Sequence, residues 1–186
     1  MLFPQPEFRP VSYSRITLTE LMIPAYANFG GKIHGGILLS LMDKVAYAAA
    51  SKHAGAYCVT VSVDGVNFLQ PVEVGELVSL LASVNYVGRT SLLVGIKVIA
   101  EDVRAGSVKH TNTSYFTMVA KDDSGQPTPV PGLTLETHDD TRRFLESIKR
   151  REFRERNKAE FDTALSGLAV QQELHLLDKE RCQIAY

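Results

Sequence analysis

The stretch GGILLSLMDKVAYAAASKH, residues 35–53, decides the fold of this chain. At 100° per residue, one side of this predicted helix carries Leu38, Leu41 and Val45, and the opposite side is also largely apolar, with Leu39 and Ala46. A helix that is apolar on nearly all sides is a buried one. Residues 35–53 are therefore predicted to lie in the core, wrapped by the rest of the domain.

The residues that follow predict the sheet that wraps this helix. Apolar residues alternate with other residues in the runs 57–68, 77–87, 91–102 and 108–120, which are separated by turn residues. This alternation is typical of half-buried strands, and the short turns favour an antiparallel meander. An earlier strand is expected at 14–22, where Ile16 and Leu18 alternate with threonines before Pro24. The predicted class is α+β, a long antiparallel sheet around one helix.

Length, charge and cysteine usage narrow the class of protein. The 186 residues suffice for one domain with a tail, and a net charge of -1 gives no attraction toward nucleic acid. Cys58 and Cys182 lack the spacing of a zinc site or a disulfide framework. The start MLFPQPEFRP does not have the pattern of a signal peptide, and no run of about 18 apolar residues occurs. We therefore expect a cytoplasmic protein without a membrane partner.

The chain changes character after the prolines of QPTPVPG, residues 126–132. We predict one domain at 1–132 and a charged helical extension at 133–186. Its run TRRFLESIKRREFRERNKAEF mixes both charges at helical spacing, with Phe144 and Ile148 as apolar anchors. Two interpretations stay open: a solvated helix docked on the domain or on a neighbouring subunit, and a helix whose basic residues, including Arg142 and Arg143, grip phosphate.

Asp43 is the first candidate for chemistry, because a carboxylate within an apolar helix must be neutralised, hydrogen-bonded or used. Gly35 and Gly36 would let another molecule approach backbone N–H groups that lack a helical partner, and these donors can hold a developing oxyanion. Gly36 and Asp43 lie within about 20° of each other and roughly 10 Å apart along the axis. One substrate could contact both. The alternative is an Asp43 that is hydrogen-bonded to a strand for structural reasons.

The loop NFGGKIHGG, residues 28–36, supplies two further candidates. It matches neither the phosphate loop nor the dinucleotide fingerprint. Asn28 is either part of a site or a turn residue, and His34 is either a general base or a polar residue at the helix entry. The sequence contains no Gly-x-Ser-x-Gly elbow and no pair of histidines at metal-ligand spacing, which argues against a serine hydrolase or a zinc enzyme. Cys58 is expected to be a small buried hydrophobe.

The segment ANFGGKIHGGILLSLMDKVAYAAA, residues 27–50, resembles the active-site segment of hot-dog acyl-CoA thioesterases of the YciA and brain acyl-CoA hydrolase group. That family has an Asn ahead of an HGG or FGG helix start and an acidic residue inside the helix. In this chain these are Asn28, the HGG at residues 34–36, and Asp43. The stretches 59–78, 85–98 and 110–120 also resemble the family's strands, so the resemblance covers about residues 12–132.

The resemblance implies a hot-dog fold whose units pair side by side, commonly as three dimers in a hexamer, with the active site between two units. It implies that Asp43 is a general base that activates water or a nucleophile that forms an anhydride, and that Asn28 orients the water or the thioester. The N–H groups of Gly35 and Gly36, beside His34, would hold the thioester oxygen.

The turn of Arg89, Thr90 and Ser91 suits a CoA phosphate, although a solvated turn is the alternative. No metal and no cofactor is expected, since CoA enters as part of the substrate. Two other functions stay open. A hot-dog hydratase or dehydratase would need a paired Asp and His at another spacing, and a non-catalytic acyl-CoA sensor would bind ligand and signal through its charged helices.

Overall fold

The computed structural model describes residues 7–186. They separate into two units, one that ends at Ser147 and one that comprises Ile148–Tyr186, and each is described by itself. The expected functional division at 132/133 stays a prediction.

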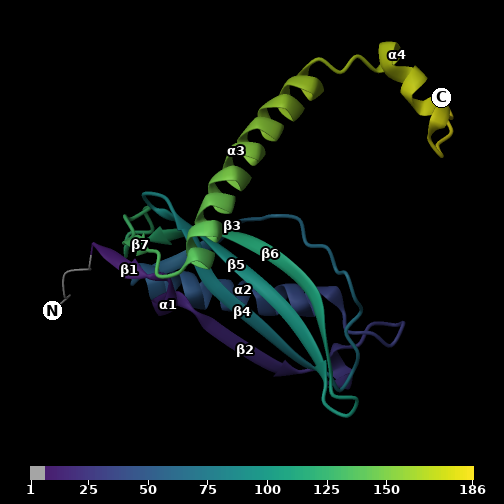
Figure 1. The fold of residues 1–186 in the computed structure, drawn as a ribbon. Helices are drawn as coiled ribbons and strands as arrows, with labels where there is room; N and C mark the ends of the chain where they lie inside the picture. Colours follow the sequence, from purple (N-terminus) through teal and green to yellow (C-terminus); the bar gives the residue numbers. More distant parts are fainter. Residues whose placement is uncertain (1–6) are drawn as a thin grey trace. The chain divides into compact units, whose positions relative to one another are not determined.

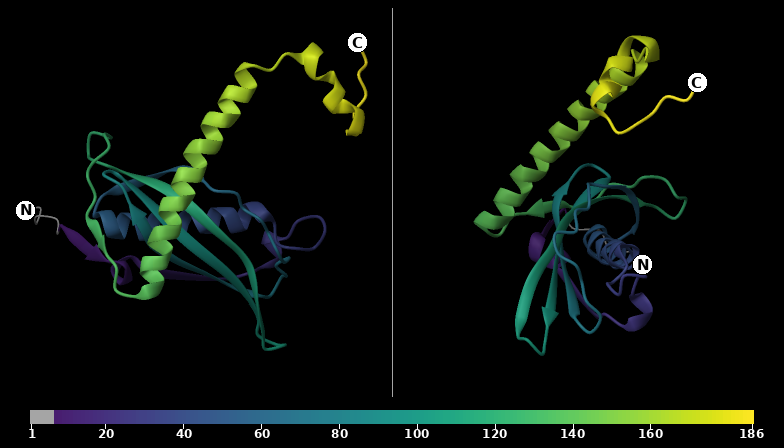
Figure 2. Two further views of the ribbon diagram at one scale, coloured as in Figure 1. Left: turned by 45° about the horizontal axis from the view of Figure 1, so that its top comes forward. Right: turned by 90° about the vertical axis from the view of Figure 1, so that its right-hand side faces the viewer.

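The first unit is a five-stranded antiparallel sheet that curls around the helix α2 (Gly35–Ala54), as Figures 1 and 2 show. The helix contacts all five strands. The strand order is β2-β4-β5-β6-β3, with bounds β2 (Ile16–Leu21), β3 (Tyr57–Val63), β4 (Leu77–Val87), β5 (Ser91–Asp102) and β6 (Ser107–Lys121). This arrangement confirms the predicted fold class.

Cross-strand rows of apolar side chains form the core beneath α2. Leu18 pairs with Leu80, Leu80 with Val98, and Val98 with Asn112, so one row crosses four strands on the face that contacts the helix. The aliphatic members are buried or partly buried. Asn112 is the polar exception, and its amide Nδ2 lies 3.4 Å from the sulfur of Met42 on α2. Side chains that alternate between the two faces of each strand therefore form the core face that the sequence predicted.

The C-terminal end of α2 is capped by the glycine that follows it and by Arg9 of the N-terminal segment. Gly55 ends the helix at φ 68, a left-handed conformation that glycine adopts without a Cβ clash. The guanidinium of Arg9 donates to the carbonyls of Lys52 and His53, at 2.9 and 2.5 Å, which satisfies acceptors that the last turn leaves open. These contacts fix the C-terminal end of the helix, where the chain turns into β3.

One prediction about α2 is wrong for the single chain. The helix was expected to be buried on nearly all sides, but one stripe is uncovered: Leu39 and Tyr47 are 40% and 43% exposed, and Asp43 and Lys44 between them are exposed as well. The sheet curls around only part of the helix (Figure 2), and the stripe is exposed in the single chain.

The strand predicted at 57–68 differs from the expectation in two ways. It is shorter, and it does not lie next to β4 as a simple meander would require. β3 ends at Val63 and pairs with β6 at the edge of the sheet, so only β4, β5 and β6 form a meander. Beyond Val63 the chain keeps single backbone bonds to β6, from Asp64 and Leu69, and then contacts the loop before α2. Gly65 interrupts the alternation and weakens the strand. The strand expected at 14–22 forms at Ile16–Leu21.

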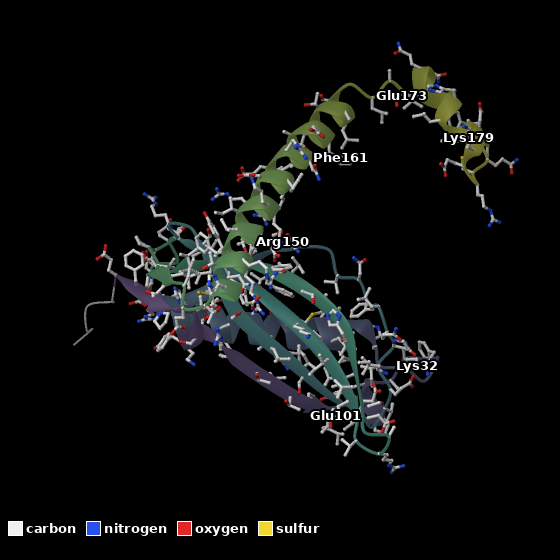
Figure 3. All side chains as sticks on the ribbon, viewed as in Figure 1. Lys32, Glu101, Arg150, Phe161, Glu173 and Lys179 are labelled. Atoms are coloured by element: carbon white, nitrogen blue, oxygen red, sulfur yellow. The ribbon has the colours of Figure 1, made fainter. Side chains whose placement is uncertain are left out.

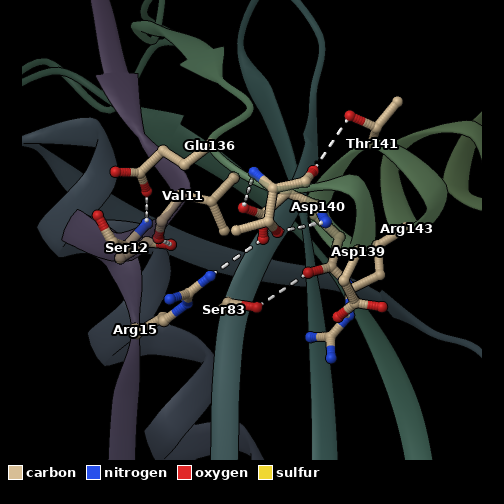
Figure 4. A network of polar contacts seen from close by, with 12 residues as sticks. Val11, Ser12, Arg15, Ser83, Glu136, Asp139, Asp140, Thr141 and Arg143 are labelled. Atoms are coloured by element: carbon tan, nitrogen blue, oxygen red, sulfur yellow. Dashed lines mark hydrogen bonds and ion pairs between the residues drawn. The ribbon is translucent and has the colours of Figure 1, made fainter.

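Short elements complete the first unit. They are β1 (Phe8–Pro10), which pairs in parallel with β7 (Gly132–Thr134), the one-turn helix α1 (Val11–Ser14) and the 3-10 turn η1 (Pro24–Tyr26). The helix α3 (His138–Ser166) starts in this unit and is held there by the polar network of Figure 4. Arg15 pairs with the buried carboxylate of Asp140 at 3.1 Å, and the Ser12 N–H donates to Glu136 at 3.0 Å.

The second unit is helical and strongly charged. It contains the rest of α3, the short helix α4 (Val170–Glu173) and the 3-10 segment η2 (Leu174–Lys179), whose side chains Figure 3 displays. Along α3, Lys149 pairs with Glu152 and Arg156 with Glu160 at helical spacing. The mixed-charge helix predicted from residues 141–161 is therefore confirmed.

A buried histidine makes the stability of the first unit depend on pH. His53 is fully buried, and its Nε2 lies 3.0 Å from the carbonyl oxygen of Pro131. Burial lowers the pKa of His53, the nearby Arg9 charge lowers it further, and the bond to Pro131 opposes both effects in part. The folded protein therefore resists a proton that the unfolded chain accepts.

We expect the melting temperature to be steady above pH 7 and to fall as the pH drops below about 6.5, the pKa of an unperturbed histidine. The loss amounts to about 1.4 kcal/mol for each unit by which the folded pKa is depressed. Thermal unfolding between pH 5 and 8 measures it. His53→Gln should flatten this dependence, and the exposed control His175→Gln should not. An unchanged slope in His53→Gln would assign the dependence to other groups.

Candidate active site

A cavity of about 390 Å³ opens between α2 and the edge strand β3. It is open to solvent, and its lining residues come from these two elements. The helix supplies Asp43, Lys44 and Tyr47, which lie on the uncovered stripe, and the strand supplies residues 57–60. The cavity thus combines one carboxylate, one lysine and one threonine hydroxyl with two tyrosines, a cysteine and a valine.

Thr60 holds the carboxylate of Asp43. Its Oγ1 donates to Asp43 Oδ1 at 2.6 Å, and the sulfur of Met118 lies 3.2 Å from the same hydroxyl. The hydroxyl has one proton, and the carboxylate is the stronger acceptor, so Asp43 receives it. Asp43 is exposed in the single chain, contrary to the expectation of a buried carboxylate. The bond to Thr60 orients one carboxylate oxygen and leaves the other available to a water molecule or a ligand.

The start of α2 differs from the expected oxyanion site. The N–H of Gly36 donates to Nδ1 of His34 at 2.8 Å, so His34 is the N-cap of α2. A Cβ on Gly36 would lie 2.9 Å from the His34 ring, and one on Gly35 would lie 3.1 Å from the Phe68 ring. Both glycines therefore make room for rings of this chain. In this conformation the Gly36 N–H is occupied, and among residues 7–186 no hydrogen bond from the Gly35 N–H is found.

Asn28 occupies the loop before α2 and acts there as a turn residue. Its Oδ1 accepts from the N–H groups of Gly30 and Lys32, at 2.9 and 3.2 Å. Figure 3 shows Lys32 on this loop, whose tip carries the fully exposed Phe29. Asn28 does not line the cavity that contains Asp43. The structure of one chain therefore brings Asp43 to Thr60 but does not bring Asn28 to Asp43.

The predicted phosphate turn lies near the cavity without lining it. Arg89 is exposed in the turn between β4 and β5, and its carbonyl accepts from Val130 at 3.0 Å. The carbonyl of Thr90 accepts from Ala120 at 2.9 Å, and Ala120 pairs with Cys58, which lines the cavity and is buried as expected. Ser91 begins β5. The turn therefore reaches the sheet end where β3 begins.

No functional role was assigned from the sequence to five residues that line the cavity: Lys44, Tyr47, Tyr57, Val59 and Thr60. Period two places Thr60 on the same side of β3 as the buried Cys58, toward α2, and this pattern could have predicted a hydroxyl beside the helix. The pattern does not say which helix residue it meets, because that depends on how the strand is placed in the sheet.

A second cavity, of about 380 Å³, lies between the sheet and the start of α3. Its arginines already have carboxylate partners: Arg15 pairs with Asp140 and Arg142 with Glu146. These contacts favour an anchoring role over phosphate binding. Among residues 7–186 no group of three or more His, Cys, Asp or Glu side chains could hold a metal ion. Nor is any helix in that range long and apolar enough to cross a membrane.

Comparison with known proteins places the chain in a family. The model of the thioesterase superfamily matches residues 30–107. Protein VdlD of Helicobacter pylori is 46% identical over 143 residues, which cover 77% of this chain and 82% of VdlD. The uncharacterized acyl-CoA thioester hydrolase YkhA of Bacillus subtilis is 32% identical over 89% of this chain and 96% of YkhA. The chain therefore belongs to the acyl-CoA thioester hydrolases of the thioesterase superfamily.

A longer relative and solved structures agree with this assignment. The cytosolic acyl coenzyme A thioester hydrolase of Rattus norvegicus is 34% identical over 76% of this chain, which spans only 38% of that protein. A hexameric acyl-CoA thioesterase is similar with a TM-score of 0.80 and 36% identity, over 83% of this chain and 99% of that chain. The Staphylococcus aureus acyl-CoA hydrolase, in complex with butyryl coenzyme A and coenzyme A, has a TM-score of 0.77 and 31% identity. The similarity covers 86% of this chain and 97% of that chain.

Structures of the same S. aureus enzyme exist for variants named Asp43Ala, Thr60Ala and Asn28Ala, the last in complex with coenzyme A. The present chain has Asp, Thr and Asn at the same three numbers.

Proposed function

We propose that the protein hydrolyses acyl-CoA thioesters to free CoA and a carboxylic acid, with Asp43 as the residue that starts the reaction. The observation that carries the proposal is the Asp43 carboxylate, fixed by Thr60 at 2.6 Å and placed in a cavity that Lys44, Tyr47 and residues 57–60 also line. The family supports the reaction class, and the S. aureus variants at the same numbers support the choice of residues.

The geometry suits two chemical routes. In the first, the free oxygen of Asp43 takes a proton from water, the resulting hydroxide attacks the thioester carbonyl, and the C–S bond breaks as the sulfur leaves and is protonated. In the second, Asp43 itself attacks the carbonyl carbon, the CoA thiolate leaves, and water hydrolyses the anhydride. Either route creates an oxyanion. The Gly35 N–H is the donor that we propose for it, in the site shared with a second chain, because Gly35 does not line the cavity of its own Asp43. Gly36 joins only if His34 turns away.

A second copy of the chain is proposed to complete the site. The stripe around Asp43 is uncovered, β3 has a partner on one side only, and exposed apolar residues border both, including Tyr57 at 60% and Val61 at 56%. Exposed apolar surface of this kind marks an interaction site. As the family resemblance implies, we propose a two-fold pair in which the Asn28 loop of one chain reaches Asp43 of the other. Hexameric relatives support a homo-oligomer, which we propose is a trimer of dimers.

Two further proposals accompany this one. The reaction requires no metal and no cofactor, since CoA is part of the substrate and product. The protein works in the cytoplasm, which the name of the cytosolic rat relative supports.

The test of the proposed function is release of free thiol from a panel of acyl-CoAs of increasing chain length, followed with a thiol reagent. Steady turnover on at least one acyl-CoA is expected. A protein that binds acyl-CoA without releasing thiol would be the sensor, and one that instead adds water to or removes water from an acyl chain would be the hydratase or dehydratase.

The Arg89 turn is proposed to bind a CoA phosphate, with Thr90 and Ser91 as neighbouring donors. Arg89→Ala should raise KM about fivefold, the scale of an exposed charge pair worth about 1 kcal/mol, and should change kcat much less, because the phosphate is remote from the scissile bond. Steady-state kinetics measure both constants. Arg104→Ala, an exposed arginine in the turn between β5 and β6, is the matched control. A KM that stays at the wild-type value would remove residue 89 from the CoA site.

A further inference from the structure

Two tyrosines form a wall of the cavity one helical turn beyond Asp43. The rings of Tyr47 and Tyr57 lie 6.0 Å apart between centroids, at 58° to each other, a distance at which aromatic rings attract. Tyr47 comes from α2 and Tyr57 from the first residue of β3, so the pair bridges the two elements that enclose the cavity. Neither ring belongs to the core, since both are largely exposed in the single chain.

The position of this pair relative to Asp43 matters for the substrate. Residues 43 and 47 are one turn apart on the same stripe, about 6 Å along the helix axis. The strand contributes Cys58 and Val59, which are buried and half-buried, to the lining, and the exposed Lys44 lines the cavity from the helix. A carbonyl carbon placed at Asp43 would therefore have the two rings and the buried Cys58 on the tyrosine side, with the exposed Lys44 at the solvent. The CoA portion is polar and long, so it would leave through the side of the cavity that is open to solvent.

We infer that Tyr47 and Tyr57 close the acyl side of the cavity and set an upper limit on acyl chain length. This inference rests on the proposed thioesterase function. A run of about 6 Å accommodates about four or five linked carbons, given a C–C bond near 1.5 Å, so short straight-chain acyl groups are the class that fits. Longer chains would have to displace one ring from the other.

The test compares kcat/KM on straight-chain acyl-CoAs from C2 to C12 for wild type and Tyr47→Ala. Wild type should peak at short chains. Tyr47→Ala should move the peak to longer chains and raise the ratio of C8 to C4 at least about tenfold, because each methylene in an apolar pocket is worth a factor of about ten or more. Tyr47→Phe keeps the ring and should keep the wild-type profile. Tyr186→Ala, a highly exposed terminal tyrosine, is the matched control.

Tyr57→Ala provides an independent second variant, because it removes the other half of the wall from β3 while α2 stays unchanged. It should shift the profile in the same direction as Tyr47→Ala. Tyr57 also borders the surface that we propose a second chain covers, so size-exclusion chromatography of each variant tests whether its assembly still matches wild type. Tyr47→Trp should have the opposite effect and shift the preference to shorter acyl groups.

The outcomes separate the two proposals. Thiol release by wild type with a shifted profile in both alanine variants supports the wall. Thiol release with chain-length profiles that superimpose on wild type would overturn the proposed role of the two tyrosines and leave the thioesterase function intact. A wild-type protein that releases no thiol from any acyl-CoA would overturn both.

Discussion

Asp43→Asn should fold and assemble normally but turn over acyl-CoA at least about 100-fold more slowly, the scale of general-base catalysis. The amide oxygen of Asn can still accept from Thr60, so the side chain keeps its position. What the variant loses is the charged oxygen that takes a proton from water or attacks the thioester. Because substrate contacts are retained, the loss should be in kcat and KM should change little. Thiol-release kinetics on the best acyl-CoA measure both constants.

Asp123→Asn is the matched control for this substitution, because Asp123 is an exposed aspartate in the turn after β6. It should retain wild-type turnover. If Asp43→Asn also retained near-normal turnover with an unchanged fold, Asp43 would be neither base nor nucleophile, and the hydrogen bond from Thr60 would have only a structural role.

The periodic elements of the fold could be predicted from the sequence because their signals are local. The helix expected at residues 35–53 forms at Gly35–Ala54, and the strands expected at 77–87 and 91–102 have those bounds. Alternation reports which face of a strand is buried, but it does not report the neighbouring strand. For that reason β3 was placed in a meander, although its partner is β6.

The candidate site was only partly predictable, and the reason is again physical. An apolar stripe such as Leu39 to Tyr47 has the same pattern whether it packs under its own sheet or against a second chain, so the sequence alone did not indicate that Asp43 is exposed. Gly35 and Gly36 were expected to admit a ligand, whereas they make room for the rings of Phe68 and His34. Period two could have suggested Thr60, but the Asp43 contact depends on tertiary placement.

The second large effect concerns the origin of the two proposed catalytic residues. Asn28 is absent from the cavity of its own chain, and the stripe around Asp43 is exposed. We therefore expect each site to combine Asn28 of one chain with Asp43 of the other. Asn28→Ala and Asp43→Asn should then each be nearly inactive alone. A mixed dimer would carry both lesions in one site and neither lesion in the other.

Subunit mixing measures this directly. Equal amounts of Asn28→Ala and Asp43→Asn are combined under conditions that allow exchange, one variant is tagged, and pull-down of the untagged partner establishes that mixed dimers have formed. With random pairing half of the dimers are mixed and each has one intact site, so thiol release should return to about a quarter of the wild-type rate. Confirmed exchange without any return of thiol release would show that Asn28 and Asp43 do not complement each other across chains, and the composite site would be contradicted.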